Sequence, residues 1–231
     1  MTQRVAIITG AGQGIGRAVA HNLAAQGVHP VLVGRTKAKL DQVAAELPMA
    51  TVAAADVTDA AQVAACIKTV QDTFGCADIL VNSAGEAFLA DLEHTTDADW
   101  DRVLAINLKG AFLMARGLLP LLRKSENASI INIASKVALH GYGEVTAYSA
   151  AKAGLVGFTR SLAKELREEE IRVVALCPGP VDTPMRWAAT PDFDRKVVIS
   201  AETVAQYVSY VVNLPRGTTM SELLVESMHY D

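Results

Sequence analysis

Short runs of β-branched and other apolar residues alternate with longer segments of helical periodicity along the whole chain. The apolar runs, which we interpret as strands, cover residues 5–9, 30–34, 51–55, 78–82, 129–134, 171–177 and 223–227. Helical patterns lie between them at residues 14–26, 37–46, 59–74, 97–123, 147–168 and 201–213. Strands that alternate with helices in this way indicate βαβ units and a parallel sheet covered on both faces. We therefore predict an α/β fold with a doubly wound, mostly parallel, seven-stranded sheet and helices on both faces.

The length and composition narrow the class of protein further. No repeat or linker divides the 231 residues, so we predict a single domain over residues 1–231. The 21 basic and 25 acidic side chains form no basic stripe, and we expect no nucleic-acid partner. The longest apolar stretches are broken by Arg116, Pro120 or glycines, so we expect no membrane partner either.

The three cysteines Cys66, Cys76 and Cys177 are an odd number without metal-ligand spacing. They indicate reduced thiols rather than a disulfide framework, and the five histidines are scattered. We expect no bound metal. The N-terminus shows no secretory pattern, so we expect a cytoplasmic protein.

The first strand runs directly into the glycine-rich stretch TGAGQGIG at residues 9–16. Gly10 permits a tight turn, and Gly14 and Gly16 let the backbone approach a ligand at a helix N-terminus, where free N–H groups favour anions. Ile15 stands where the strict G-x-G-x-x-G pattern has its last glycine, and a purely structural turn is the alternative. Its position after the first strand favours a Rossmann-type dinucleotide site, with Gln13 and Ile15 also in contact with the cofactor.

The second strand ends in Gly34-Arg35-Thr36, with no carboxylate to bind the ribose hydroxyls of NAD(H). The Arg35 guanidinium can instead pair with the 2′-phosphate of NADP(H), which we expect as cofactor in preference to NAD(H). Arg35 as a plain surface cation is the alternative. Gln13 adds no second positive charge.

A tyrosine and a lysine, Tyr148 and Lys152, lie one helical turn apart in the small-residue stretch TAYSAAKAG at 146–154. Taken alone, they are equally typical of a solvated helix. Together with TGAGQGIG, VNSAG at 81–85, INIAS ending in Ser135 and CPGPVDTP at 177–184, the stretch resembles the short-chain dehydrogenase/reductase family. The resemblance extends from about residue 4 to 185 and points to the compact, single-domain branch.

The resemblance implies that Tyr148 exchanges a proton with the oxygen of a carbonyl or alcohol substrate. A free phenol has a pKa of about 10. An ammonium ion about 5 Å away favours the phenolate by roughly 3 kcal/mol at an effective dielectric constant of about 20. We therefore expect Lys152 to lower the pKa of Tyr148 toward neutrality and to bind the nicotinamide ribose. The resemblance makes Ser135 the donor to the substrate oxygen. It makes Asn107 the residue whose backbone and bound water connect the lysine to solvent.

The resemblance also implies further contacts to the cofactor. Asn82, Ala84 and Gly85 are expected near the adenine ribose, Asp56 and Val57 near the adenine, and Pro178, Gly179, Val181 and Thr183 around the nicotinamide. A short substrate lid is expected near residues 185–199, where Trp187 and Phe193 either face an apolar pocket or pack as core. The loop residues His140, Tyr142 and Glu144 either contact substrate or are ordinary loop positions.

The ending NLPRGTTMSELLVES lacks the diglycine that is common near the family's C-terminus and looks like that of NADP-preferring carbonyl reductases and hydroxy-acid dehydrogenases. Members commonly form tetramers through the helices expected at 97–123 and 147–168, so we expect a homotetramer or homodimer, with Ala151, Gly154 and Gly157 permitting close helix contact. The function implied is an oxidoreductase that transfers hydride between NADP(H) and a small carbonyl or secondary-alcohol substrate.

Two other function classes fit the fold. A dinucleotide-sensing regulatory protein tends to lose the tyrosine or lysine, and both are present here. A sugar-nucleotide epimerase or dehydratase usually carries an additional substrate region, for which 231 residues leave no room.

Overall fold

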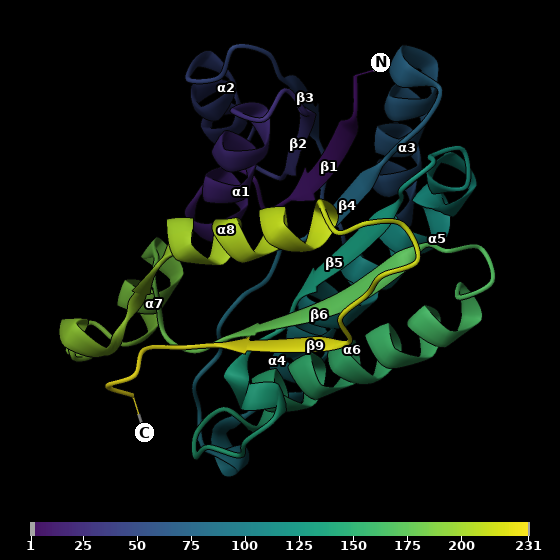
Figure 1. The fold of residues 1–231 in the computed structure, drawn as a ribbon. Helices are drawn as coiled ribbons and strands as arrows, with labels where there is room; N and C mark the ends of the chain where they lie inside the picture. Colours follow the sequence, from purple (N-terminus) through teal and green to yellow (C-terminus); the bar gives the residue numbers. More distant parts are fainter. Residues whose placement is uncertain (1–2, 231) are drawn as a thin grey trace.

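The fold is built on one seven-stranded sheet in which every strand pair is parallel (Figure 1). We examined a computed structural model, which describes residues 3–230. The strand order is β3-β2-β1-β4-β5-β6-β9. The strands are β1 Val5–Thr9, β2 His29–Gly34, β3 Thr51–Ala54, β4 Ile79–Asn82, β5 Ser129–Ile133, β6 Arg172–Pro178 and β9 Glu222–Val225. The predicted doubly wound sheet is confirmed, and the order reverses between β1 and β4, where such sheets bind ligands.

Helices cover both faces of the sheet (Figure 1). On one face are α1 Gly14–Ala24, α2 Lys37–Ala45 and α8 Ala201–Val212, and on the other α3 Ala60–Phe74, α5 Gly110–Leu122 and α6 Thr146–Glu165. Alternate residues of a strand point to opposite faces of the sheet. In β1, Ala6 and Ile8 join the core beneath α1 and α8, whereas Val5 and Ile7 join the core beneath α3 and α5. Burial on both faces explains why the strands read as continuous apolar runs.

The helix expected at 97–123 is a composite of three segments. It consists of α4 Asp97–Leu104, a π-helical turn at Ala105–Lys109 and α5 Gly110–Leu122. By length and composition alone, Asp97–Leu122 could cross a membrane, which differs from our expectation from the sequence. Half of its apolar window is buried inside the fold, as in the core helix of a globular domain. The π-turn is a local widening that is frequent at functional sites, and the apolar pattern along residues 97–123 does not reveal it.

The small residues of α6 are used mostly inside the chain. Ala151 is fully buried, and a Cβ on Gly154 would lie 2.9 Å from the Leu108 side chain. Gly157 has open space around it. Of the three positions expected to allow helix contact between subunits, only Gly157 is therefore free for that purpose.

The segment expected to form a lid is ordered into a short bridge and a helix. Strand β7, Val181–Asp182, pairs with β8, Ile199–Ser200, and α7 spans Pro184–Ala189. Helix α7 begins sharply because the Thr183 side chain accepts a hydrogen bond from the Arg186 backbone N–H. In Figure 1 the C-terminal tail after β9 runs toward α7, and the rings of Phe193 and Tyr230 lie 6.1 Å apart. The lid segment and the tail therefore meet.

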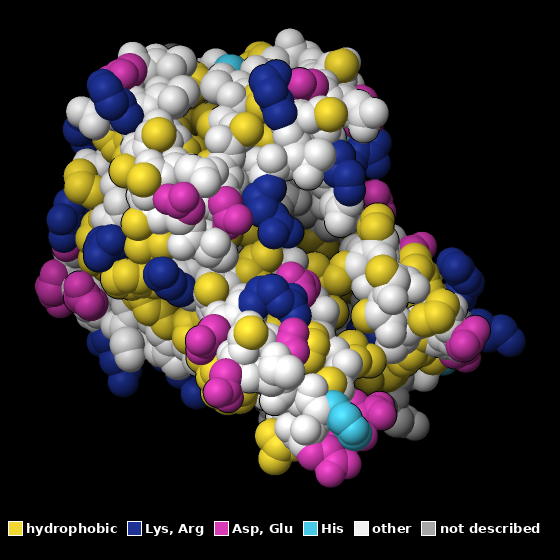
Figure 2. All heavy atoms as spheres, turned by 180° about the vertical axis from the view of Figure 1, so that it is seen from behind, with side chains coloured by type: hydrophobic (Ala, Val, Ile, Leu, Met, Phe, Trp, Pro, Cys, Tyr) yellow, Lys and Arg dark blue, Asp and Glu magenta, His cyan; other side chains and the backbone are white. Residues whose placement is uncertain are grey.

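The surface carries charges of both signs. In Figure 2, Lys and Arg side chains are interspersed with Asp and Glu side chains over the face shown, and no continuous basic patch appears there. This mixed pattern agrees with the small formal net charge of −4.

Arg172, the first residue of β6, connects this strand and β5 to the loop that leads into β9. Its side chain is buried and donates to the Thr218 carbonyl oxygen at 2.7 Å, to Ser129 Oγ at 2.8 Å and to the Pro215 carbonyl oxygen at 3.0 Å. These bonds position the chain just before β9 and the C-terminal tail.

Replacing Arg172 by Met should destabilise the protein by about 3 kcal/mol, because it leaves several buried acceptors without a donor. Urea unfolding followed by circular dichroism measures the change. The matched control is Arg167→Met, which removes an exposed arginine just after α6. Equal stabilities of the two variants would show that Arg172 is not a structural anchor.

Candidate active site

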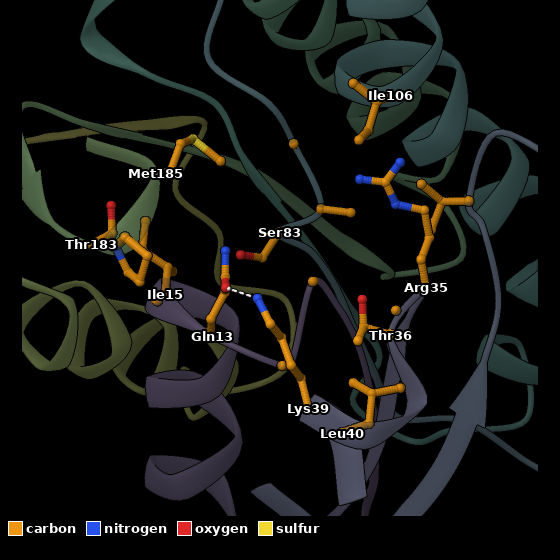
Figure 3. A pocket seen from close by; sticks show the side chains of 18 of the residues that line it. Gln13, Ile15, Arg35, Thr36, Lys39, Leu40, Ser83, Ile106, Thr183 and Met185 are labelled. Carbon is orange, nitrogen blue, oxygen red and sulfur yellow. Dashed lines mark hydrogen bonds between the residues drawn. The ribbon is translucent and has the colours of Figure 1, made fainter. Parts of the chain in front are cut away.

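Two cavities adjoin at the carboxyl ends of the strands. The first, of about 250 Å³, is lined by the glycine turn and by the ends of β2 and β3 (Figure 3). The second, of about 330 Å³, is lined by Ser135, Tyr148 and Lys152. Both are bordered by Ile15, Ser83, Gly85, Thr183 and Met185, so a ligand that fills the first can extend into the second.

The glycine turn shapes the first cavity, but its glycines have different tasks. Gly10 and Gly14 have φ angles of 67° and 54°, and both line the cavity with Gln13 and Ile15. Gly16 does not line it. A Cβ there would lie 2.4 Å from the Gly10 carbonyl oxygen, so Gly16 allows the helix to pack on the turn, which corrects the expectation that it approaches a ligand.

The N-terminus of α1 suits a phosphate group. Gln13 occupies the N-cap position without making a side-chain capping bond, and the first turn contains no acidic residue. The free N–H groups of this turn therefore have no side-chain acceptor among the described residues, and the helix dipole adds a partial positive charge. The residues present fit a dinucleotide phosphate.

Two cations flank the end of β2. Arg35 lines the cavity as predicted, and so does Lys39, which the sequence analysis did not single out. Lys39 Nζ donates to Gln13 Oε1 at 2.8 Å across the cavity mouth, as Figure 3 shows. Gln13 brings no charge of its own, yet it holds an ammonium ion next to the glycine turn.

The remaining residues expected in this cavity divide into two groups. Asp56, Val57, Ala84 and Gly85 line it as expected. Asn82 does not; its Nδ2 donates to Asn132 Oδ1 at 2.8 Å inside the sheet. The Asn82 side chain therefore does not face the cavity, and the expected position of this residue near the adenine ribose stays a prediction. Ser83 takes that place in the cavity wall.

Ser135, Tyr148 and Lys152 come together in the second cavity from β5 and α6. Lys152 is buried, and its Nζ donates to the Ile133 carbonyl oxygen at 2.8 Å. The same Nζ lies 5.7 Å from the centre of the Tyr148 ring. Ser135 precedes a 3₁₀ turn at Lys136–Ala138, whose Val137 N–H it caps at 3.3 Å.

The pKa values of this group differ from the expectation. Desolvation lowers the pKa of Lys152 to about 8 and raises the pKa of Tyr148. The Ser135 side chain and the positive charge of Arg186 oppose the rise in the pKa of Tyr148. Burial disfavours the charged forms of the amine and the phenol alike, and the expected lowering of the Tyr148 pKa by Lys152 stays a prediction.

Asn107 lies in the π-turn behind the second cavity and is buried. Its Nδ2 donates to the carbonyl oxygens of Glu86 and Val103, both at 3.0 Å, and its Oδ1 accepts from the Glu86 N–H at 3.2 Å. A Cβ on Gly85 would lie 2.7 Å from Asn107 Oδ1 and 3.4 Å from Lys152 Nζ. Glycine at position 85 thus leaves room for Asn107 Oδ1 and Lys152 Nζ beside the segment that follows β4.

The substrate side of the second cavity is formed by the segments that follow β5 and β6 and by the C-terminal tail. Pro178, Gly179, Val181 and Thr183 line it, as expected for residues around the nicotinamide. Tyr142 lines it, but His140 is exposed and does not, which corrects that expectation. Among the lid aromatics, Phe193 faces the cavity, whereas Trp187 donates from Nε1 to Asp182 Oδ1 at 2.6 Å outside it.

The polar and charged lining residues that the sequence did not single out include Lys39, Ser83, Arg186 and Tyr230. Ser83 was recognisable as part of VNSAG. The other three lie on the exposed turn of a helix, in the lid and in the tail, where nothing local indicates which side chains face a ligand.

The buried Lys152 predicts a pH-dependent stability. Its pKa is about 8 when folded and about 10.5 when unfolded, so the unfolded chain binds more protons between these values and wild-type stability rises with pH. Relative to Lys152→Met, wild-type stability should rise by about 3 kcal/mol between pH 7 and pH 11. Urea unfolding measures this in a Cys177→Ala background, because the charges of Lys152 and Cys177 act on each other's pKa. The thiol of Cys66, whose pKa burial raises to about 11, cancels in the difference. A control, Lys164→Met on an exposed turn of α6, should give a flat difference, and a flat difference for Lys152 would contradict the burial of a titrating amine.

Comparison with known proteins agrees with this geometry. An uncharacterized oxidoreductase of Staphylococcus epidermidis is 35% identical over 224 residues, which cover 96% of each chain. An alcohol dehydrogenase from the archaeon Thermococcus sibiricus, solved in complex with 5-hydroxy-NADP, has a TM-score of 0.92 at 26% identity and covers 100% of this chain and 99% of its own. A 3-ketoacyl-(acyl-carrier-protein) reductase from Brucella melitensis, solved with NADH, has a TM-score of 0.87 at 30% identity over 96% of each chain.

The family model described as short chain dehydrogenase matches residues 4–193, which include both cavities apart from the C-terminal tail. This match spans well over half of the chain, and the fold and the relatives agree with it. The chain therefore belongs to the short-chain dehydrogenase/reductase family of oxidoreductases.

Proposed function

We propose that this protein reduces a ketone or aldehyde to an alcohol, and catalyses the reverse reaction, with NADP(H) as cofactor. The observation that carries the proposal is that Ser135, Tyr148 and Lys152 line one cavity, which adjoins a second cavity suited to a dinucleotide. When bound, the nicotinamide cofactor supplies or accepts the hydride. The protein supplies the proton, the orientation of the substrate and the exclusion of water.

Tyr148 is the proton donor in this proposal. Because desolvation raises the pKa of its phenol, Tyr148 is protonated at neutral pH and ready to donate to a carbonyl oxygen. Ser135 donates a hydrogen bond to the same oxygen as negative charge develops there. The cavity thus favours the direction of carbonyl reduction at neutral pH, since oxidation needs the phenolate.

In this proposal Lys152 lies next to the phenol of Tyr148 and binds the cofactor. The Ile133 carbonyl oxygen holds its Nζ in place, and both this Nζ and Asn107 Oδ1 lie next to Gly85. From this position Lys152 can hydrogen-bond a ribose hydroxyl. A ligand oxygen also favours the ammonium form and restores part of the charge that burial suppresses.

The preference for NADP(H) is supported by two cations rather than one. Arg35 and Lys39 line the same cavity at the end of β2, and Lys39 is directed toward the glycine turn by Gln13. The acid in this wall, Asp56, is engaged by the Thr58 N–H at 2.9 Å and the Thr58 hydroxyl at 2.8 Å. A 2′-phosphate therefore meets two cations with little competition from a carboxylate.

The sequence expectations on assembly and location are kept as parts of this proposal. We propose a cytoplasmic homotetramer or homodimer that acts on a small molecule. The outer face of α4 and α5 supports an interface, since Trp100 and Phe112 are each 39% exposed there and Gly157 of α6 is open.

Replacement of Tyr148 by Phe tests the reaction. It should reduce kcat for an aliphatic or aromatic ketone by at least about 1000-fold, because the proton donor is lost. The Kd for NADPH, measured by fluorescence, should change by less than about threefold. Tyr207→Phe, which alters an exposed tyrosine of α8, serves as the control. Full turnover by Tyr148→Phe would remove Tyr148 from the mechanism.

The two cations predict the cofactor ratio. Arg35→Asp should shift the ratio of kcat/KM for NADPH over NADH by about 100-fold toward NADH, and Lys39→Met should shift it by about tenfold, as expected for lost charge-assisted hydrogen bonds. Lys37→Met is the matched control, because Lys37 lies on the same helical turn but pairs with Asp41 at 2.8 Å outside the cavity. An unchanged ratio in both cavity variants would show that neither residue reads the phosphate.

A further inference from the structure

The second cavity contains a cation that the reaction itself does not require. Arg186, in the middle of the short helix α7, lines this cavity together with Ser135 and Tyr148. Its guanidinium lies 4.7 Å from the centre of the Phe193 ring, and Nη1 donates to Thr190 Oγ1 at 3.3 Å. Stacking on an aromatic ring and one hydrogen bond hold the guanidinium in place while most of its N–H groups are left for a ligand.

No acidic side chain neutralises this guanidinium within residues 3–230. The neighbouring cations are engaged: Lys136 pairs with Glu226 at 2.6 Å, and Arg195 stacks on Trp187 at 3.9 Å. Arg186 forms no ion pair with any described residue, and no Asp or Glu lines the cavity. The positive charge of Arg186 also opposes the rise that burial causes in the pKa of Tyr148 and in the pKa of Tyr230. The charge therefore lies close to the reacting end of the cavity.

Much of the rest of the cavity wall is apolar or aromatic. The apolar lining includes Met185, Ala189 and Phe193 from the lid, and Leu89 and Val145 from other segments. An arginine that adds a positive charge to such a wall, apart from the group of Ser135, Tyr148 and Lys152, selects a ligand that carries an anionic group on an apolar body. A neutral ligand would leave the cation facing an apolar surface without a partner.

We propose that Arg186 binds the carboxylate of the substrate, so that the protein acts on oxo acids and the corresponding hydroxy acids. The guanidinium and a carboxylate form paired, charge-assisted hydrogen bonds, which fix one end of the substrate while Ser135 and Tyr148 hold the oxygen at the other end. This inference rests on the proposed carbonyl reduction and adds the class of substrate to it.

Another role for the same guanidinium is to bind the diphosphate of the cofactor. Thr183 and Met185, which lie just before Arg186, border both cavities. The two roles differ in a measurable way. A carboxylate-binding Arg186 affects the KM of acidic substrates and not the Kd of NADPH, whereas a diphosphate-binding Arg186 affects the Kd of NADPH with every substrate.

The test compares methyl-ketone acids with their uncharged primary amides. The probes are 4-oxopentanoate, 5-oxohexanoate and 6-oxoheptanoate, whose increasing length covers a range of distances between carbonyl and carboxylate. Steady-state rates with NADPH are measured for the wild type, Arg186→Met and Arg186→Lys. The control is Arg195→Met, which removes a lid arginine that does not line the cavity. Asp231 lies outside the described residues, so Asp231→Asn is measured alongside and should keep the wild-type preference.

For the wild type, kcat/KM of at least one acid should exceed that of its amide by tenfold or more. Arg186→Met should abolish this preference through the KM of the acids, while the Kd of NADPH stays within about threefold; Arg186→Lys should restore part of the preference. Equal rates for acids and amides in the wild type would overturn the substrate class but leave carbonyl reduction standing. Weaker binding of NADPH to Arg186→Met, seen as a higher Kd, would also overturn the carboxylate-binding role of Arg186 and would favour the diphosphate-binding role.

Binding provides a readout that does not depend on turnover. If neither acids nor amides are reduced, the proposed function fails, and the carboxylate site is judged by titrating 5-oxohexanoate into the protein–NADPH complex and following the NADPH fluorescence. Binding to the wild type that is lost in Arg186→Met supports the site. Absence of binding to the wild type overturns it.

Discussion

The burial of one amine, Lys152, is the constraint around which the catalytic end of this fold is arranged. An ammonium ion is costly to bury, and the cost appears as a pKa lowered to about 8. The Ile133 carbonyl oxygen, at the end of β5, is the acceptor that makes this burial tolerable. A side chain at Gly85 would clash with Asn107 Oδ1 and would lie against the amine, so glycine at this position leaves room for both groups. The strand ends are thus shaped to hold a group that weakens the free protein.

This constraint changes the electrostatic account of Tyr148. From sequence we expected an amine one helical turn away to lower the pKa of the phenol, and the turn spacing is present, but the environment raises that pKa. Desolvation opposes the effect that a nearby positive charge has on a phenol, and the sequence does not reveal how deeply the phenol is buried. The protonated phenol suits donation to a carbonyl oxygen, and Ser135 and Arg186 set the limit of the rise.

The fold was predictable from sequence because strands of a sheet that is covered on both faces appear as continuous apolar runs. The glycine turn marks where the first of these strands ends. What could not be predicted depends on contacts between distant segments. The π-turn around Asn107 interrupts a helix whose apolar pattern continues without a break. Gly16 and Asn82 belong to motifs that we expect to bind the cofactor, and only tertiary packing shows that Gly16 lies against the glycine turn and that the Asn82 side chain bonds inside the sheet. Lys39 lies on an exposed helical turn and has the sequence pattern of a solvated lysine. Only the structure shows that its Nζ donates to Gln13 Oε1.

The net charge of the chain is negative, whereas the charged side chains that line the two cavities are mostly positive. This difference bears on function. The chain is formally −4, with acids spread over its surface, yet Arg35, Lys39, Lys152 and Arg186 all line the two adjoining cavities. Asp56 is the acid in these walls, and Thr58 already engages it. Low-dielectric walls of one sign concentrate ligands of the opposite sign, whatever the total charge of the protein. The joined cavity therefore favours anions along its whole length, from a phosphorylated cofactor at one end to a carboxylate at the other.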